Sequence, residues 1–217
     1  MPESLTTLRD RVEQILEDAT NAKWDTTELD EAIRQALDAY SEHVPHRAVA
    51  SITLTAPGRE VDISALDYRT IERIWWDYDN TDPDHPPHWR DFELWPGGIL
   101  YIDDYEEPNT GDVVRIWHTT DHTLNGLDSA TATTFPDRHA SVIARGAAAF
   151  AATQRRLTIL EQANLNEWAP RNLREWAERQ LSIFYQELQD LAQKAAALSA
   201  GTAPMPDLDR WDGPNAW

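Results

Sequence analysis

The chain has 217 residues, of which 38 are acidic and 19 are lysine or arginine, giving a formal net charge of -19 at pH 7. This balance argues against a protein that wraps nucleic acid, because cationic side chains drive binding to phosphate backbones. The lack of cysteine excludes disulfides and thiolate chemistry. No signal-peptide-like run and no stretch of about 18 apolar residues occurs, so the sequence predicts a soluble protein that the general secretory route does not export.

Residues 1–46 are predicted to form a hairpin of two helices. Apolar side chains recur at helical spacing over 4–20, after a capping residue at Ser4, and again over 27–44, where Pro45 ends the helix. The apolar stripes are Leu5, Leu8, Val12, Ile15 and Ala19 in the first helix, and Leu29, Ile33, Ala36, Leu37, Tyr40 and Val44 in the second.

Residues 47–133 are predicted to form a small antiparallel β module inserted between helices. Between about 47 and 120 the apolar period changes to two, which is typical of strands, and the turn sequences Pro57-Gly58 and Pro96-Gly97-Gly98 separate them. The strand at 71–78 carries Trp75 and Trp76 on opposite faces, so both faces need cover. We expect one ring to pack beneath the helices and its neighbour to face another subunit.

Residues 134–199 are predicted to form the remaining helices of the bundle. The small residues Gly146-Ala147-Ala148-Ala149 allow another helix to approach closely. From about 169 to 199 the spacing is that of a coiled-coil seam, formed by Ala177, Leu181, Phe184, Leu188, Leu191, Ala195 and Leu198. The expected fold is therefore α+β, a helical bundle of about four helices with an inserted small antiparallel β module and an extended C-terminal tail.

The tail, residues 200–217, lacks any period but carries several large apolar side chains. Leaving such side chains in water forgoes about 1.5 to 3 kcal/mol each. The tail is therefore expected to dock, either on its own bundle or on a neighbouring chain. The residues assigned to partner binding are Pro204, Met205, Leu208, Trp211 and Trp217.

Several segments together resemble the adaptor, or head-completion, proteins of the tailed-phage head–tail connector. They are DTTELDEAIRQALDAYSEHVP, GDVVRIWHTTDHTL, the Phe135-Pro136 entry into ARGAAAFAA, and the aromatic, Pro-rich tail. The resemblance implies a non-enzymatic virion protein, assembled in the host cytoplasm, that forms a ring of about twelve copies beneath the portal.

The resemblance further implies which partners the chain has. The portal protein would be gripped by residues 204–217, the next tail or neck component would lie on the other side, and DNA would pass through the ring without specific binding. No membrane and no cofactor are expected. The helices at 27–44 and 137–199 would build the ring. The residues assigned to the subunit interface are Trp75, Trp76, Ala177, Leu181, Phe184 and Leu188.

Two other chemistries are compatible with local groups of side chains. One loop holds Asp82, Asp84, His85 and His88 and another holds His118, Asp121 and His122, which are metal-competent side chains, but their spacing matches no zinc signature and no metal site is predicted. The carboxylate pairs Asp103-Asp104 and Glu106-Glu107 could serve as glycosidase acid and base, but pairs arise by chance in so acidic a chain.

The main alternative function is a carbohydrate-binding or tail-associated binding module. Its basis is the set of tryptophans in the β region, Trp75, Trp76, Trp89, Trp95 and Trp117, because flat aromatic rings can stack on sugar faces. The phosphate-binding, nucleophile-elbow and dinucleotide-binding motifs are absent from the sequence, so no enzymatic activity is predicted.

Overall fold

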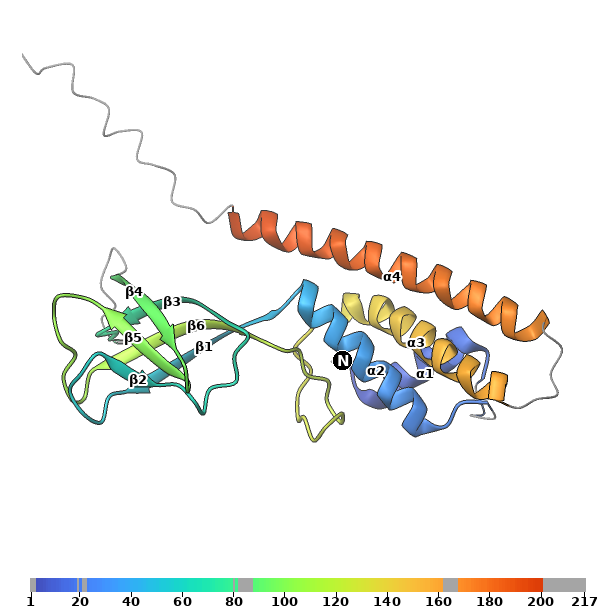
Figure 1. Ribbon diagram of the computed structural model, residues 1–217, viewed down its shortest axis with the longest axis horizontal. Helices are drawn as coiled ribbons and strands as arrows, with labels where there is room; N and C mark the ends of the chain where they lie inside the picture. Colours follow the sequence, from blue (N-terminus) through green and yellow to red (C-terminus); the bar gives the residue numbers. More distant parts are fainter. Residues whose placement is uncertain are drawn as a thin grey trace, which may run out of the picture.

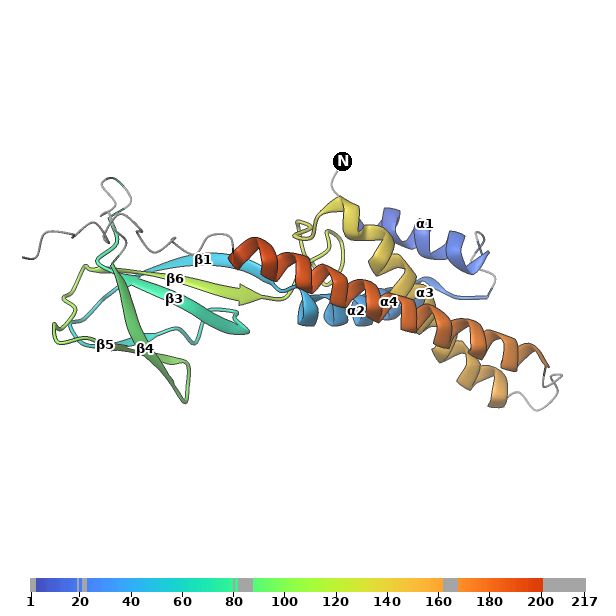
Figure 2. The same cartoon turned by 90° about the horizontal axis from the view of Figure 1, so that it is seen from above.

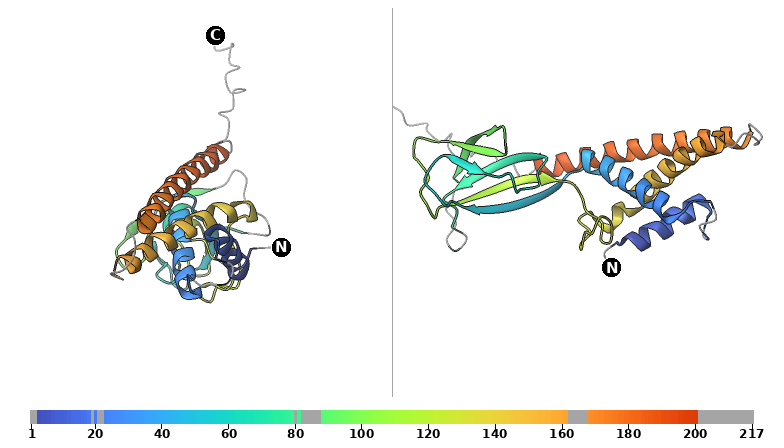
Figure 3. Two further views of the ribbon diagram at one scale, coloured as in Figure 1. Left: turned by 90° about the vertical axis from the view of Figure 1, so that its right-hand side faces the viewer. Right: turned by 60° about the horizontal axis from the view of Figure 1, so that its bottom comes forward.

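A computed structural model describes residues 3–18, 20, 23–79, 81, 88–161 and 168–200. The described chain is α+β, and its helices and its sheet lie end to end instead of in stacked layers (Figures 1 and 2). Among the described residues, no helix packs across either face of the sheet (Figure 3). Within the described residues no helix has the length and apolar character needed to cross a membrane.

The helical part contains four described α-helices around one apolar core. They are α1 (Leu5–Leu16), α2 (Thr26–His43), α3 (Ala140–Glu161) and α4 (Trp168–Ala200), with a short 3-10 turn, η1 (Asp137–His139), before α3. Capping boxes at Ser4 and Asp25 start α1 and α2 by satisfying backbone N–H groups that the first turn leaves open. Helix α1 ends earlier than the predicted residue 20, because Glu17 adopts the left-handed conformation (φ 53°).

The close approach predicted at the Gly146 segment is confirmed between α3 and α4. A Cβ atom on Gly146 would lie 2.7 Å from ring atoms of Phe184, a side chain that is fully buried. Glycine is therefore required here for a packing reason, since its backbone conformation is that of an ordinary helix.

The prediction of a small β module inserted in a helical bundle is wrong. The structure has a six-stranded antiparallel sheet in the order β1-β6-β3-β4-β5-β2, curled into a half-barrel. Its strands are β1 (His46–Thr53), β2 (Glu60–Asp62), β3 (Thr70–Trp76), β4 (Trp89–Trp95), β5 (Ile99–Asp103) and β6 (Val113–Thr120). The curl lets the inner face bury its own core, which includes Ile74, Trp76, Leu100, Ile102 and Ile116, without help from the helices.

Two paired strands join the sheet to the helices. Strand β1 follows α2 after two residues, β6 leads back toward the helices, and the pair is hydrogen-bonded in register from His46 opposite Thr120 to Thr53 opposite Val113. Beyond β6, the backbone N–H of His122 donates to Ser41 Oγ on α2 (2.9 Å). Both β1 and β6 are thus fixed to α2 at the junction.

We expect Gly146→Ala to destabilise the helical part despite alanine's better helix propensity. The added methyl group overlaps the buried Phe184 ring, and overpacking of this kind costs about 1 to 3 kcal/mol of unfolding free energy. Urea unfolding should show the loss, and the background Phe184→Leu is the control. There Gly146→Ala should be neutral or stabilising; an equal loss in both backgrounds would contradict the packing explanation.

Candidate partner-binding surface

The outer face of the sheet carries a cluster of tryptophan and arginine side chains. Strand register places Trp75 opposite both Arg115 and Trp89, and Arg73 opposite Trp117, so all five project to the same side. We call this surface the Trp–Arg face and define it as Arg73, Trp75, Tyr78, Trp89, Arg115 and Trp117.

The rings of the Trp–Arg face pack edge to face. Ring centroids of Trp75 lie 5.0 Å from Tyr78 and 5.7 Å from Trp89, and Trp89 lies 4.9 Å from Trp117, with interplanar angles of 66° to 82°. Edge-to-face pairs are favoured by the ring quadrupole, and each contributes about 0.5 to 1.5 kcal/mol beyond area burial.

Guanidinium groups lie over the faces of these rings. Arg73 is 5.2 Å from the centroid of Trp89, and Arg115 is 4.2 Å from Tyr78 and 5.2 Å from Trp117. Such cation–π contacts hold the arginines against the sheet. The two arginines therefore present a fixed positive charge within an aromatic surface.

Two hydrogen-bond donors of the Trp–Arg face are buried without an acceptor. They are the indole Nε1 of Trp75 and the Nε of Arg115, which belong to directly opposed residues on β3 and β6. Leaving a buried donor unpaired costs about 1 to 3 kcal/mol. The described part of the chain supplies no acceptor for either donor.

The Trp–Arg face also borders exposed apolar surface. Trp89 is 42% exposed and Val49, which lies opposite Trp117 on β1, is 46% exposed. Trp75 is only 6% exposed, because its neighbours on the same face cover it. The edge of the aromatic cluster is therefore open to a second molecule while its centre is already packed.

Of the two tryptophans assigned to the interface, Trp76 lies in the inner core of the sheet. Its Nε1 donates to Asp112 Oδ2 (3.0 Å), and the guanidinium of Arg90 lies 5.1 Å from its ring centroid. One ring of the pair thus points inward as expected, but the half-barrel itself covers it. The expectation that the inward ring packs beneath the helices is wrong, because the helices lie beyond the end of the sheet (Figure 1).

The α4 residues assigned to the interface lie mainly inside the protomer. Ala177, Phe184 and Leu188 are buried in the helical core, where α4 packs on α3, and Leu181 is half-buried. Their side chains are thus occupied within one chain. The apolar side chains that α4 leaves outward are Ile183 and Tyr185, at 37% and 40% exposure.

The other residues singled out in the sequence are divided between described and undescribed segments. The tail residues Pro204, Met205, Leu208, Trp211 and Trp217 lie outside the described residues, as do Asp82, Asp84 and His85. The described residues contain no group of three or more His, Cys, Asp or Glu side chains placed to hold a metal ion.

Both ring nitrogens of His122 are used in holding the chain together. Nε2 lies 2.9 Å from the carbonyl oxygen of Val44, so it carries the proton and donates, and Nδ1 accepts from the hydroxyl of Thr134 (3.0 Å). Asp121 pairs with Arg69, and His118 is buried. The His118–His122 segment is therefore built into the junction and is not open to a metal ion.

Burial, followed by the charge of the nearby His46, lowers the pKa of His122 to about 4. The ring is therefore neutral at pH 7. This agrees with its two hydrogen bonds, in which Nε2–H donates to Val44 and Nδ1 accepts from Thr134.

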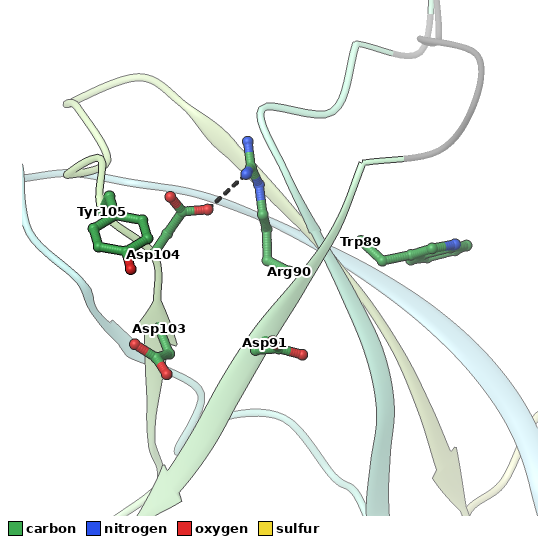
Figure 4. Close-up of a pocket in the computed structure, with 6 residues that line it drawn as sticks. All are labelled: Trp89, Arg90, Asp91, Asp103, Asp104 and Tyr105. Atoms are coloured by element: carbon green, nitrogen blue, oxygen red, sulfur yellow. Dashed lines mark hydrogen bonds and ion pairs between the residues drawn. The ribbon is translucent and has the colours of Figure 1, made fainter.

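The carboxylate pairs lie at and just beyond the end of β5. A cleft of about 530 Å³ is lined by Trp89, Arg90, Asp91, Asp103, Asp104 and Tyr105 (Figure 4). Asp104 forms an ion pair with Arg90 (2.6 Å), whereas Glu106 and Glu107 are exposed on the following loop. This is the arrangement of a solvated loop anchored by one ion pair.

Comparison of the sequence with models of protein families and with curated proteins finds no match.

We predict that His122 makes the protein less stable as the pH falls from about 6.5 to 4. In this window the unfolded imidazole takes up a proton and the folded one does not, so the free energy of unfolding decreases by about 2 kcal/mol after allowance for partial solvent access. Urea unfolding of wild type and His122→Gln at a series of pH values tests this. The difference in unfolding free energy between wild type and His122→Gln should decrease as the pH falls. A difference that is constant with pH would refute the prediction.

Proposed function

We propose that the chain is a ring-forming structural adaptor of a tailed-phage head–tail connector. In this role it joins the portal to the next tail or neck component, continues the DNA channel, and performs no catalysis. The proposal starts from the resemblance of the α2, β6 and α3 segments to such adaptors, and three features of the described chain support it.

The observation that carries the proposal is the exposed edge of the Trp–Arg face. Two buried donors without acceptors, Trp75 Nε1 and Arg115 Nε, lie beside an open aromatic edge at Trp89. A neighbouring subunit would cover this edge, where Trp89 is 42% and Val49 is 46% exposed.

The second support is that the rest of the chain covers only part of the surface of α4. With 33 residues this helix is about 50 Å long at 1.5 Å per residue. Its buried side chains lie in the helical core, and Ile183 and Tyr185, on either side of the buried Phe184, are 37% and 40% exposed. A long helix that keeps exposed apolar side chains beside its buried seam offers surface to a neighbour in a ring.

The third support is the charge. A wall that carries the net charge of -19 per copy repels a moving polyanion and does not retain it. Multiplied over a ring, this repulsion suits a conduit through which DNA passes without binding.

The arrangement of the aromatic side chains does not favour the carbohydrate-binding alternative. A sugar needs an exposed flat aromatic face, but Arg73 covers the face of Trp89 and Arg115 covers Tyr78 and Trp117. The edge-to-face packing also prevents the rings from forming one plane.

We expect Trp89→Ala to weaken assembly, with Trp95→Ala as the matched control. Both tryptophans lie on β4 and are similarly exposed, at 42% and 39%, but Trp95 lies at the other end of the strand and stacks on Tyr101. Native mass spectrometry, with and without portal, measures the oligomer. Loss of assembly only in Trp89→Ala supports the proposal; equal assembly of both variants with wild type would contradict it.

Deleting residues 204–217 should abolish attachment to the portal and leave the fold intact. All the packing described above lies within residues 3–200, so thermal unfolding followed by circular dichroism should be unchanged. Co-sedimentation with portal measures attachment. Normal attachment of the truncated chain would show that the tail does not bind the portal.

A further inference from the structure

The largest cleft that we describe lies at the junction of the helices and the sheet. It has a volume of about 730 Å³ and is built from the end of α2, the start of β1, the segment after β6, η1, the start of α3 and the last turns of α4. Its lining residues are Tyr40, Val44, Pro45, His46, Arg47, His122, Thr134, Pro136, Arg138, His139, Val142, Leu191, Lys194 and Ala195. A pocket of this size holds an aromatic side chain together with its flanking groups.

The charge of the cleft is opposite to that of the chain. Its lining contains Arg47, Arg138 and Lys194 and no Asp or Glu, although acidic residues outnumber basic ones 38 to 19 in the whole sequence. Arg47 is paired with Glu72 at the rim (3.0 Å), while Arg138 and Lys194 are exposed on opposite walls. Apolar walls with a positive rim suit a ligand that combines an aromatic group with carboxylates.

Tyr40, one of the residues that line the cleft, is hydrogen-bonded to His139. Arg138 Nε donates to Nε2 of His139 (3.2 Å), so the neutral imidazole carries its proton on Nδ1 and donates it to the Tyr40 hydroxyl oxygen (2.6 Å). The phenol proton then has no acceptor among the described residues. Tyr40 is fully buried, and burial raises its pKa to about 12, so the phenol keeps its proton at neutral pH.

A second surface of the chain has the complementary character. The loop that follows β5, residues 103–107, reads Asp-Asp-Tyr-Glu-Glu and presents Tyr105 at 102% exposure (Figure 4). We call it the acidic knob. A fully exposed tyrosine flanked by acids is a typical anchor for an interface, since its ring buries a large area with few rotatable bonds.

The acidic knob is held in shape by two arginines. Arg59 donates from Nε to the carbonyl oxygen of Asp104 and from Nη2 to that of Tyr105, each at 3.0 Å. Arg90 pairs with the Asp104 carboxylate (2.6 Å). Because the backbone of the loop is fixed before any contact forms, docking would cost little conformational entropy.

The acidic knob cannot reach the cleft of its own chain. It lies before the start of β6, whereas the cleft lies beyond the end of that strand. The eight residues of β6 span about 25 Å at the rise of an extended strand. A ligand of this chemistry from the same protein must therefore come from another copy.

We propose that the acidic knob of one copy inserts into the junction cleft of a second copy. Tyr105 would enter between the apolar walls, and Glu106 and Glu107 would face Arg138 and Lys194. Knob and cleft are different surfaces, so the contact is head to tail, and a head-to-tail contact that closes on itself generates a ring. The inference rests on the proposed function only in taking a second copy as the occupant.

Charge reversal tests the contact in the full-length protein. We expect Arg138→Glu with Lys194→Glu, and separately Glu106→Lys with Glu107→Lys, each to weaken self-association at least about tenfold by sedimentation velocity. Mixing the two variants should restore association, because each knob then meets an oppositely charged cleft. The control, Asp10→Lys with Asp67→Lys, places the same reversal on exposed residues elsewhere. Association unchanged by the reversals, or not restored by mixing, would overturn the proposal.

Cysteine trapping tests the contact between knob and cleft even where self-association is too weak to measure. The chain has no cysteine, so Glu106→Cys and Arg138→Cys each introduce a single thiol. Mixed under mild oxidation, the two variants should give a disulfide-linked dimer in clear excess over a mixture of Asp67→Cys with Arg138→Cys. Equal yields in the two mixtures would overturn the proposal.

The outcomes separate this contact from the proposed function. If wild type forms rings that tolerate the charge reversals and give no trapped excess, the knob-to-cleft contact is wrong and the adaptor proposal stands. If neither rings nor trapped dimers form, even with portal present, both are wrong. Trapped dimers without portal binding would support the contact and contradict the adaptor.

Discussion

The ability of the sheet to bury its own inner face is the constraint on which the other features depend. On strand β3, the side chains of Ile74 and Trp76 point inward, where they pack with residues of the other strands, and that of Trp75 points outward. Because the half-barrel fills itself, no helix is needed to cover it, and the helices pack around a separate core. The outer face is thereby left to aromatic rings and arginines.

The helical elements could be predicted closely because their signals are local. The predicted helix at 169–199 is found as α4, residues 168–200, and the Gly146 segment meets Phe184 as its small side chains indicate. The assignment of Ala177, Phe184 and Leu188 to a subunit interface did not follow the same logic. A coiled-coil spacing reports that a seam is buried, but not whether the covering helix belongs to the same chain, and here it is α3.

The sheet and its surfaces could not be predicted to the same depth because they depend on which strands become neighbours. Alternation identified the strands, but the order β1-β6-β3-β4-β5-β2, the register shift between Ile71 and Arg73 and the curl are set by pairing across long loops. Nothing in the sequence distinguishes Arg73 and Arg115 from other charged residues; only the register brings them over the aromatic rings. The junction cleft has no signal in the sequence, since its walls come from four stretches that lie far apart along the chain.

The paired β1 and β6 strands determine how motion passes through the molecule. Two independent flexible tethers would let the half-barrel swing freely, but these connections form one ladder, with His122 fastening its helical end to α2. Bending at that point requires breaking the hydrogen bonds of His122 to Ser41 and Val44. The half-barrel and the helices are therefore joined by a braced connection, which resists a change in the angle between them more than two single strands would.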